Sequence, residues 1–216
     1  MYKKYIKRLL DIILALLAIV ILLPLYAILS IMVFIGMGAP VLFSQERIGK
    51  DEKIFRLYKF RSMTNAKDEK GKLLEESKRL TKFGVALRSS SLDELPELFM
   101  ILKGDMSFVG PRPLPKYYGP YFFEEERKRH RVRGGLIPPD SLAKQATLDW
   151  ESQFKYEIYY AENVSFWLDV KVILYTFIIL IKRVQTNYGA DDRPHLNAYR
   201  SNMYISEAVF EEWKNK

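Results

Sequence analysis

The sequence predicts a mostly helical α/β domain that associates with a membrane through an N-terminal re-entrant helix–break–helix hairpin and interfacial amphipathic helices. Three observations support this fold class. A long apolar run occupies residues 9–37, residues 40–63 contain stretches with strand-like alternation, and apolar residues recur at helical spacing further along the chain. With 216 residues, the chain is long enough for one domain with a buried core and an appendage.

The apolar run from Leu9 to Met37 has two strong interruptions, Asp11 and Pro24. Because about 20 apolar residues suffice to cross a bilayer, a straight span is one interpretation. Pro24 favours a hairpin instead, since proline removes a helical hydrogen bond and tends to kink or break a helix. From this run alone, both interpretations remain open.

Basic residues lie on both sides of the apolar run. They are Lys3, Lys4, Lys7 and Arg8 before it, and Arg47, Lys50, Lys53, Arg56, Lys59 and Arg61 after it. The positive-inside rule would place both flanks in the cytoplasm. A hairpin that enters and leaves by the same face satisfies this rule, whereas a single crossing does not.

We divide the chain into a membrane hairpin (residues 1–38), a domain of soluble character (39–184) and a C-terminal tail (185–216) to which we assign no role. In the central domain, strands are expected within residues 40–49 and 54–63, followed by a solvated segment that runs into a helix before residue 79.

Further along, residues 124–133 and 147–163 are expected to be helical, and the glycines and prolines of residues 134–139 predict a loop. The apolar stretch from Val172 to Ile181 has about half the length needed to cross a bilayer. It predicts either a core helix or a helix that lies in the plane of the membrane.

The composition restricts the chemistry. A net charge of +8 suits nucleic acid, anionic lipid or phosphorylated substrates, and the apolar run favours the last two because it has no purpose in nucleic-acid binding. Without cysteine there is no disulfide, thiol nucleophile or thiolate metal site, and two histidines make a multi-histidine site improbable. Any metal would be a hard cation held by carboxylates and phosphate oxygens.

A polar stretch from Arg88 to Pro96 has two interpretations. In the first, Ser91 and Glu94 form an S-x-x-E capping box for a helix that begins at Leu92 and stops at Gly104, so its acids only favour the helix dipole. The apolar residues of that helix recur at helical spacing: Leu92, Leu95, Leu98, Phe99 and Leu102.

The second interpretation is catalytic. Asp93 and Glu94 would lie at a helix start, a position that favours anions. Several cations occupy the same part of the sequence, namely Lys59, Arg61, Arg88 and Arg112. Carboxylates among cations suggest phosphoryl chemistry on a hard metal, and a carboxylate whose pKa is lowered by the helix start and the cations could attack phosphorus. Alternatively, the cations form a solvated basic face near anionic lipid.

Three motifs then occur in order: Lys59–Met63 (KFRSM), Arg88 with Ser91–Pro96 (SLDELP), and Lys103–Pro113 (KGDMSFVGPRP). With F-x-Q-x-R-x-G at residues 43–49 and L-D-x-K at 168–171, the sequence resembles the bacterial sugar transferases, specifically the small monotopic phosphoglycosyl transferases, from about Lys7 to Arg183. The resemblance makes residues 39–184 the catalytic domain.

This resemblance implies transfer of a sugar 1-phosphate from a UDP-sugar to undecaprenyl phosphate at the cytoplasmic face of the bacterial inner membrane, with release of UMP. The family's nucleophile, which forms a covalent phosphosugar intermediate and works with Mg²⁺, matches Asp93. Its acidic partner, implicated in metal binding or proton handling, matches Glu94. The resemblance thus also assigns Asp93 to the metal site.

Pro24 matches the proline that breaks the family's re-entrant helix, so the resemblance favours the hairpin. Arg112 matches the arginine of the Pro-Arg-Pro motif, and we assign it, with Lys59 and Arg88, to phosphate recognition.

The sequence departs from the family after residue 133. Many members have a Pro-Gly-Ile-Thr-Gly-like loop there, whereas residues 134–141 read GGLIPPDS, and Lys144-Gln145 replaces the familiar continuation. The departure leaves donor recognition open. A non-enzymatic scaffold whose basic face binds anionic lipid remains the alternative function.

Overall fold

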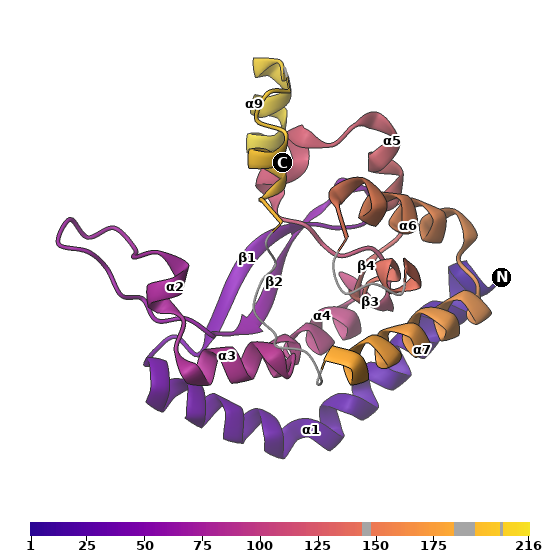
Figure 1. Cartoon of the computed structure of the whole chain (residues 1–216). Helices are drawn as coiled ribbons and strands as arrows, with labels where there is room; N and C mark the ends of the chain where they lie inside the picture. The colour runs from indigo at the N-terminus through magenta and orange to yellow at the C-terminus, as the bar shows by residue number, and fades with distance from the viewer. Residues whose placement is uncertain (144–147, 184–192, 204) are drawn as a thin grey trace.

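The computed structural model describes residues 1–143, 148–183, 193–203 and 205–216. The longer helices are α1 (Lys7–Met37), α3 (Lys82–Ser89), α4 (Glu97–Lys103), α6 (Trp150–Asn163), α7 (Phe166–Arg183) and α9 (Glu207–Asn215). The short helices are α2 (Glu76–Arg79), α5 (Glu124–Arg127) and α8 (Leu196–Tyr199), and the strands are β1 (Leu42–Ile48), β2 (Ile54–Phe60), β3 (Met106–Val109) and β4 (Gly134–Ile137). The fold is thus mostly helical with little sheet, as the sequence predicts (Figure 1).

The described strands form two separate pairs. β1 and β2 are an antiparallel hairpin with Leu42 opposite Phe60, which confirms both strands expected from the sequence. β3 and β4 are parallel, with Met106 opposite Gly134.

The loop expected at residues 134–139 is therefore wrong for its first four residues, because these form β4. The glycines permit close contact between backbones here: a Cβ added to Gly135 would lie 2.1 Å from the backbone nitrogen of Gly110. Glycine in a strand marks such close approaches, but in a single sequence the same residues resemble a loop.

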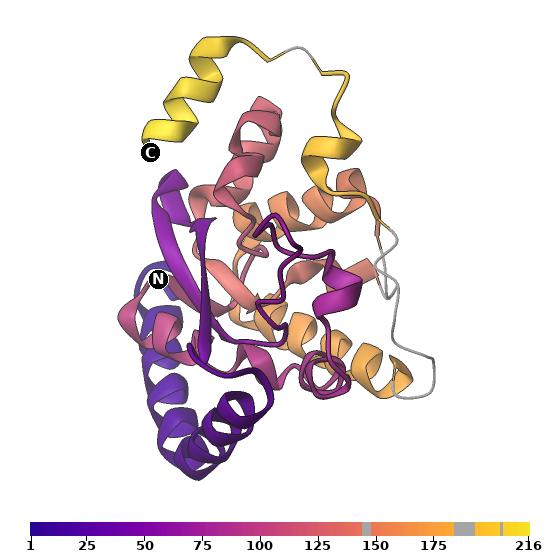
Figure 2. The same ribbon diagram turned by 90° about the vertical axis from the view of Figure 1, so that its left-hand side faces the viewer.

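Helix α1 runs without interruption through Pro24, where the sequence predicts a break between two arms. Figures 1 and 2 show that its axis instead changes direction along its length. Because proline has a φ angle close to that of a helix and lacks only its own N–H, a long helix can continue through it with a bend. Among the described residues, the segment Tyr2–Met37 is long and apolar enough to cross a membrane.

Helix α1 packs along the body of the molecule for most of its length. Ala15 and Ile19 are buried against Leu98 and Ile101, and Leu29 and Val33 are in a second cluster with Phe60 and Leu87. Asp11 is buried as well. Its carboxylate accepts hydrogen bonds from the Ser107 hydroxyl (2.8 Å) and the Phe108 amide (3.1 Å), so this interruption of the apolar run is a polar anchor to β3.

Helix α7, which contains the apolar stretch near residue 172, packs partly in the core, and its placement in the plane of a membrane stays a prediction. Leu168 and Val172 are buried in the core, whereas the indole of Trp167 is 76% exposed. Its Asp169 accepts hydrogen bonds from Tyr2, Tyr160 and the Lys7 ammonium, at 2.5, 2.6 and 2.8 Å, and so joins α7 to the start of α1.

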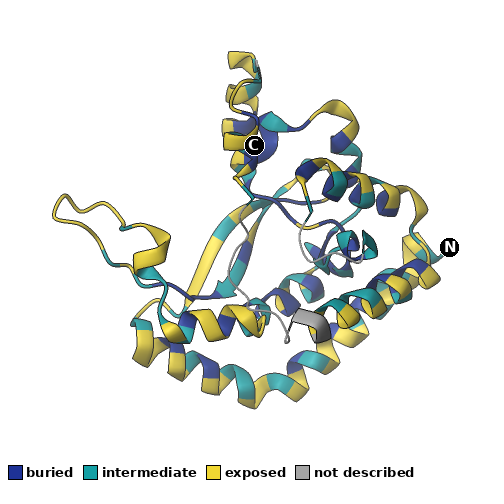
Figure 3. Cartoon of the chain, viewed as in Figure 1, coloured by how far each residue is buried: buried dark blue, intermediate teal, exposed yellow. Residues whose placement is uncertain are grey.

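The outer surfaces of α1 and α7 are largely apolar and exposed (Figure 3). Examples are Leu16, Leu17, Val20, Ile21 and Leu23 on α1, and Ile173, Leu174, Phe177, Ile178 and Leu180 on α7. Both helices lie along the same lower side of the molecule in Figures 1 and 2. An exposed apolar surface of this extent is typical of a membrane-binding face.

The described residues of the C-terminal tail (193–203 and 205–216), to which the sequence assigns no role, contribute to the core of the soluble body. Leu196 and Trp213 are buried in one cluster with Ile48, Leu114 and Phe154. The C-terminal segment thus packs behind the chain that follows Pro113, on the side of the molecule away from α1 (Figure 2).

Candidate active site

Asp93 and Glu94 lie in a single 3₁₀ turn, Leu92–Glu94, and α4 begins only at Glu97. The helix expected from Leu92 with a Ser91 capping box is therefore wrong. Ser91 has a φ of 54° and its side chain makes no capping hydrogen bond. Pro96 explains the change, because it has no N–H to donate to the turn before it but is well suited to precede a helix.

Lys59, on β2, brings two carboxylates together. Its ammonium lies 2.5 Å from Oε1 of Glu94 and 3.2 Å from Oε1 of Glu97. Glu97 is only 3% exposed, and the sequence analysis did not identify it. Its position three residues after Glu94 was the available signal, because side chains at this spacing can lie on the same side of a helical segment.

The pKa values of Asp93, Glu94 and Glu97 are shifted in different directions. That of Asp93 is raised, whereas the sequence predicted a lowered pKa for the nucleophile. Burial raises the pKa of Asp93 to about 6, against the opposing effect of Lys59, and the charge of Glu94 raises it further. Burial likewise raises the pKa of Glu97 to about 7. For Glu94, the attraction of Lys59 and Arg112 outweighs burial, so its pKa is lowered. Burial therefore decides the pKa of Asp93, where the sequence suggested that cations would.

Two of the cations considered in the sequence, Arg61 and Arg88, have different surroundings. Arg88, on α3, donates from Nε to the Ser62 hydroxyl (2.8 Å), and its charge lowers the pKa of Asp93. Arg61 instead binds the end of α1, where it donates to the carbonyl oxygens of Met37, Gly38 and Ala39. Arg61 is therefore a cap for the helix rather than part of the candidate site.

Arg112 has an exposed side chain in the wall of a cavity of about 280 Å³. The described lining includes polar residues, among them Glu94, Asp140, Ser141 and Thr176, as well as apolar ones. The apolar residues include Leu95, Leu98, Leu136, Ile137, Ile179 and Leu180. Glu94 thus reaches this cavity, and Asp93 is not among the described lining residues. An amphipathic cavity of this kind suits a ligand with a charged group and an apolar chain.

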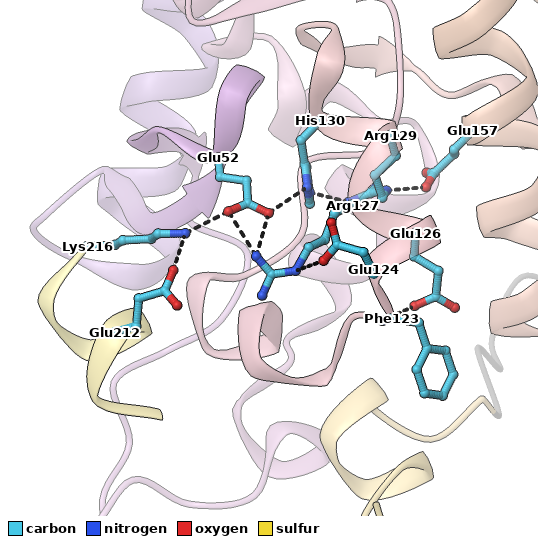
Figure 4. Close-up of polar contacts among 10 residues, drawn as sticks. All are labelled: Glu52, Phe123, Glu124, Glu126, Arg127, Arg129, His130, Glu157, Glu212 and Lys216. Carbon is cyan, nitrogen blue, oxygen red and sulfur yellow. Dashed lines mark hydrogen bonds and ion pairs between the residues drawn. The ribbon is translucent and has the colours of Figure 1, made fainter. Parts of the chain in front are cut away.

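A larger cavity of about 640 Å³ lies at the turn between β1 and β2 and is lined by charged side chains. Its charges largely neutralise one another: Glu52 accepts from Arg127 at 3.1 Å and from Lys216 at 2.6 Å (Figure 4). Its described lining contains neither Glu94 nor Arg112, both of which line the smaller cavity. We therefore assign the candidate site to the smaller cavity.

Comparison with known proteins identifies the family. The family model described as "Bacterial sugar transferase" matches residues 2–183. The chain belongs to the bacterial sugar transferase family.

Curated relatives of this transferase support the assignment. It is 41% identical to "Uncharacterized sugar transferase EpsL" of Bacillus subtilis over 163 residues, which cover 76% of this chain and 79% of the relative. It is 34% identical to the "UDP-N-acetylgalactosamine-undecaprenyl-phosphate N-acetylgalactosaminephosphotransferase" of Aeromonas hydrophila, over 86% of this chain and 45% of the relative. It is 35% identical to the "UDP-glucose:undecaprenyl-phosphate glucose-1-phosphate transferase" of Klebsiella pneumoniae, over 79% of this chain and 39% of the relative. The chain thus spans less than half the length of the last two.

In this transferase, the predicted site residues are brought together from four parts of the chain. Lys59 contacts Glu94 directly, and Asp93 is influenced by the charges of Lys59 and Arg88. Arg112 interacts electrostatically with Glu94. Their catalytic roles stay predictions. The departing segment continues into residues 144–147, so Lys144-Gln145 lies outside the described residues.

The described residues of the transferase include no group of three or more acidic, histidine or cysteine side chains arranged to hold a metal. Mg²⁺ does not require such a group, since it commonly binds one or two carboxylates together with substrate phosphates. The assignment of Asp93 and Glu94 to a Mg²⁺ site stays a prediction.

Proposed function

We propose that this transferase moves a sugar 1-phosphate from a UDP-sugar to undecaprenyl phosphate and releases UMP, as the first membrane step of a bacterial glycoconjugate pathway. The observation that carries the proposal is the Asp93–Glu94 turn beside Lys59, next to a cavity that is lined by Glu94, Arg112 and several apolar side chains. Relatives named as undecaprenyl-phosphate phosphotransferases support the same reaction.

The proposed reaction has two steps. A carboxylate oxygen of Asp93 attacks the sugar-linked phosphorus of the donor, and the bond from that phosphorus to the UMP oxygen breaks, so UMP leaves with the electron pair. A phosphate oxygen of undecaprenyl phosphate then attacks the same phosphorus and releases the Asp93 carboxylate. With a pKa of about 6, Asp93 is largely ionised at neutral pH.

The cations of the site have distinct places in this proposal. Arg112 is well suited to bind a phosphate through bidentate hydrogen bonds at the cavity wall. Lys59 stabilises the ionised form of Glu94 and so supplies a fixed charge pair beside the nucleophile. Mg²⁺, when bound by Asp93 and Glu94 with the diphosphate, would neutralise negative charge on the phosphates.

We further propose that the transferase is monotopic, with α1 entering and leaving the cytoplasmic face of the inner membrane as a bent re-entrant helix. Two sets of contacts support this. Near its start, Arg8 donates to the carbonyl oxygens of Ile101 and Leu102, and its end is capped by Arg61. Both ends of α1 thus contact the same soluble body, an arrangement that does not suit a helix with its ends on opposite sides of a bilayer.

The nucleophile can be tested with purified protein, Mg²⁺ and a UDP-sugar labelled in the sugar. We expect UMP release and, without acceptor, a labelled protein adduct. Asp93→Asn should lose the adduct and lower turnover by about a thousandfold or more. Full activity in this variant would refute the nucleophile assignment. A wild-type protein that binds anionic vesicles but releases no UMP from a panel of UDP-sugars would instead favour the scaffold.

A further inference from the structure

Arg129 and Glu157 form an ion pair in the interior of the protein. Nε of Arg129 lies 2.6 Å from Oε2 of Glu157, and the two side chains are 1% and 0% exposed (Figure 4). Arg129 comes from the 3₁₀ segment Lys128–Arg131, and Glu157 from the middle of α6.

This pair binds both main-chain polar groups of one residue, Arg112. The amide of Arg112 donates to Oε1 of Glu157 at 2.9 Å, and the carbonyl oxygen of Arg112 accepts from Nη2 of Arg129 at 2.5 Å. The neighbours of Arg112 are Pro111 and Pro113, whose rings restrict the backbone on either side. The N–H and the C=O of Arg112 are therefore both hydrogen-bonded to the pair, while its side chain lines the cavity.

The remaining polar groups of the pair are also well satisfied. Gln153 donates to Oε1 of Glu157 at 3.0 Å, and Nη1 of Arg129 lies 3.1 Å from Nε2 of His130. The guanidinium of Arg129 is 5.5 Å from the ring centres of both Phe122 and Phe154. Burial of an ion pair is costly and often gives no net stability over apolar residues of similar volume. Its retention here therefore calls for another benefit.

We propose that Arg129 and Glu157 are positioning residues for the guanidinium of Arg112. The pair fixes the Arg112 backbone so that its side chain faces the Glu94 end of the cavity, where it would bind a phosphate group of the substrates. The inference rests on the proposed function for what Arg112 binds, but the mechanical coupling of the pair to Arg112 does not depend on it. The proposal adds two buried residues, one of them on α6, to those that determine the geometry of the candidate site.

The test is Glu157→Gln, which keeps the side-chain shape and removes its charge. Glu126→Gln is the matched control. Glu126 is likewise buried and paired with an arginine, Arg200, at 2.7 Å, but it has no hydrogen bond to Arg112 among the described residues. We expect kcat/KM for the UDP-sugar to fall about tenfold or more for Glu157→Gln, mainly through KM, and less than about twofold for Glu126→Gln at equal folded fraction.

A double-mutant cycle separates positioning from general destabilisation. If the pair acts through the guanidinium of Arg112, introducing Glu157→Gln into the Arg112→Ala variant should lower kcat/KM by less than about twofold. An equal loss of kcat/KM in the wild-type and Arg112→Ala backgrounds would overturn the inference. Arg129→Lys provides a second route if Glu157→Gln does not fold, because it keeps the positive charge but replaces the planar group that reaches both Glu157 and Arg112.

Hydrogen exchange tests the coupling without any assay of turnover. The Arg112 amide should exchange at least about tenfold faster in Glu157→Gln than in Glu126→Gln and wild type, because its acceptor loses its charge. Unchanged exchange would overturn the positioning role. If wild-type protein releases no UMP while this exchange difference is present, the proposed function fails and the coupling stands.

Discussion

At the scale of single residues, Asp93 is placed where burial and charge oppose each other. It is 8% exposed, and burial raises its pKa although Lys59 and Arg88 oppose the rise. Glu94, next in sequence, has a lowered pKa because its carboxylate bonds to the Lys59 ammonium. Two adjacent acids therefore differ in proton affinity. In the proposed reaction, Glu94 supplies a permanent charge and Asp93 a nucleophile whose ionisation responds to pH.

This difference predicts a specific pH dependence. The pKa of Asp93 is raised from 3.8 to about 6, so its reactive carboxylate form is lost as the pH falls through 6, where an ordinary aspartate would remain ionised. A carbon-13 NMR titration of the metal-free protein, with Asp93→Asn to assign the signal, should give a midpoint near 6. Adding Mg²⁺ should move the midpoint down, because a cation favours the carboxylate. A midpoint near 4 without metal would contradict the burial argument.

At the scale of elements, α1 is held to the soluble body by polar anchors as well as apolar packing. Asp11 bonds to β3, Arg8 to the end of α4, and Arg61 to the end of α1 itself. These contacts distinguish a docked helix from a free membrane span. A span would gain from a purely apolar sequence, whereas a docked helix needs the polar side chains that match its partner.

The variant Asp11→Leu distinguishes a docked α1 helix from a free membrane span. We expect it to lower the free energy of unfolding by about 1–3 kcal/mol, because the Ser107 hydroxyl and the Phe108 amide would lose their buried acceptor. Chemical denaturation in a mild detergent provides the measurement, and Asp105→Leu, at an ion pair with the exposed Lys103, is the control. Equal or greater stability of Asp11→Leu would indicate that α1 does not dock through this carboxylate.

At the scale of the whole molecule, the apolar surfaces of α1 and α7 lie on one side and the C-terminal segment on the other (Figures 2 and 3). The candidate cavity adjoins α7, which contributes Thr176, Ile179 and Leu180 to its wall, and Arg112 contributes a cation to the same lining. In the proposed reaction, a lipid-linked phosphate would keep its chain near the exposed apolar surface of α7 while its charged end binds Arg112.

The topology that this arrangement implies can be measured directly, because the chain contains no cysteine. Single cysteines introduced at Lys4 and Lys50, on either side of α1, should both react with a membrane-impermeant maleimide from the cytoplasmic side and neither from the periplasmic side. Opposite accessibility of the two positions would show that α1 crosses the bilayer and would rule out the re-entrant arrangement.

The sequence by itself determined the features that depend on local pattern. The motifs that contain Lys59, Asp93, Glu94 and Arg112 identified the family, and strand alternation located β1 and β2. The length of the apolar run indicated the long apolar helix α1. Each of these signals is contained in neighbouring residues, because periodicity, turn chemistry and motif spacing act over a few positions.

Only the tertiary structure decided features that depend on distant contacts and burial. Glycine-rich β4 forms a strand because β3 lies beside it, and α1 continues through Pro24 while packed against the body. Asp93 has a raised pKa because the fold buries it, although the local sequence suggests the opposite. Arg112 meets Glu157 across 45 positions of the chain, a separation over which no local pattern operates. Burial and long-range hydrogen bonding belong to the assembled chain, so these properties arise only on folding.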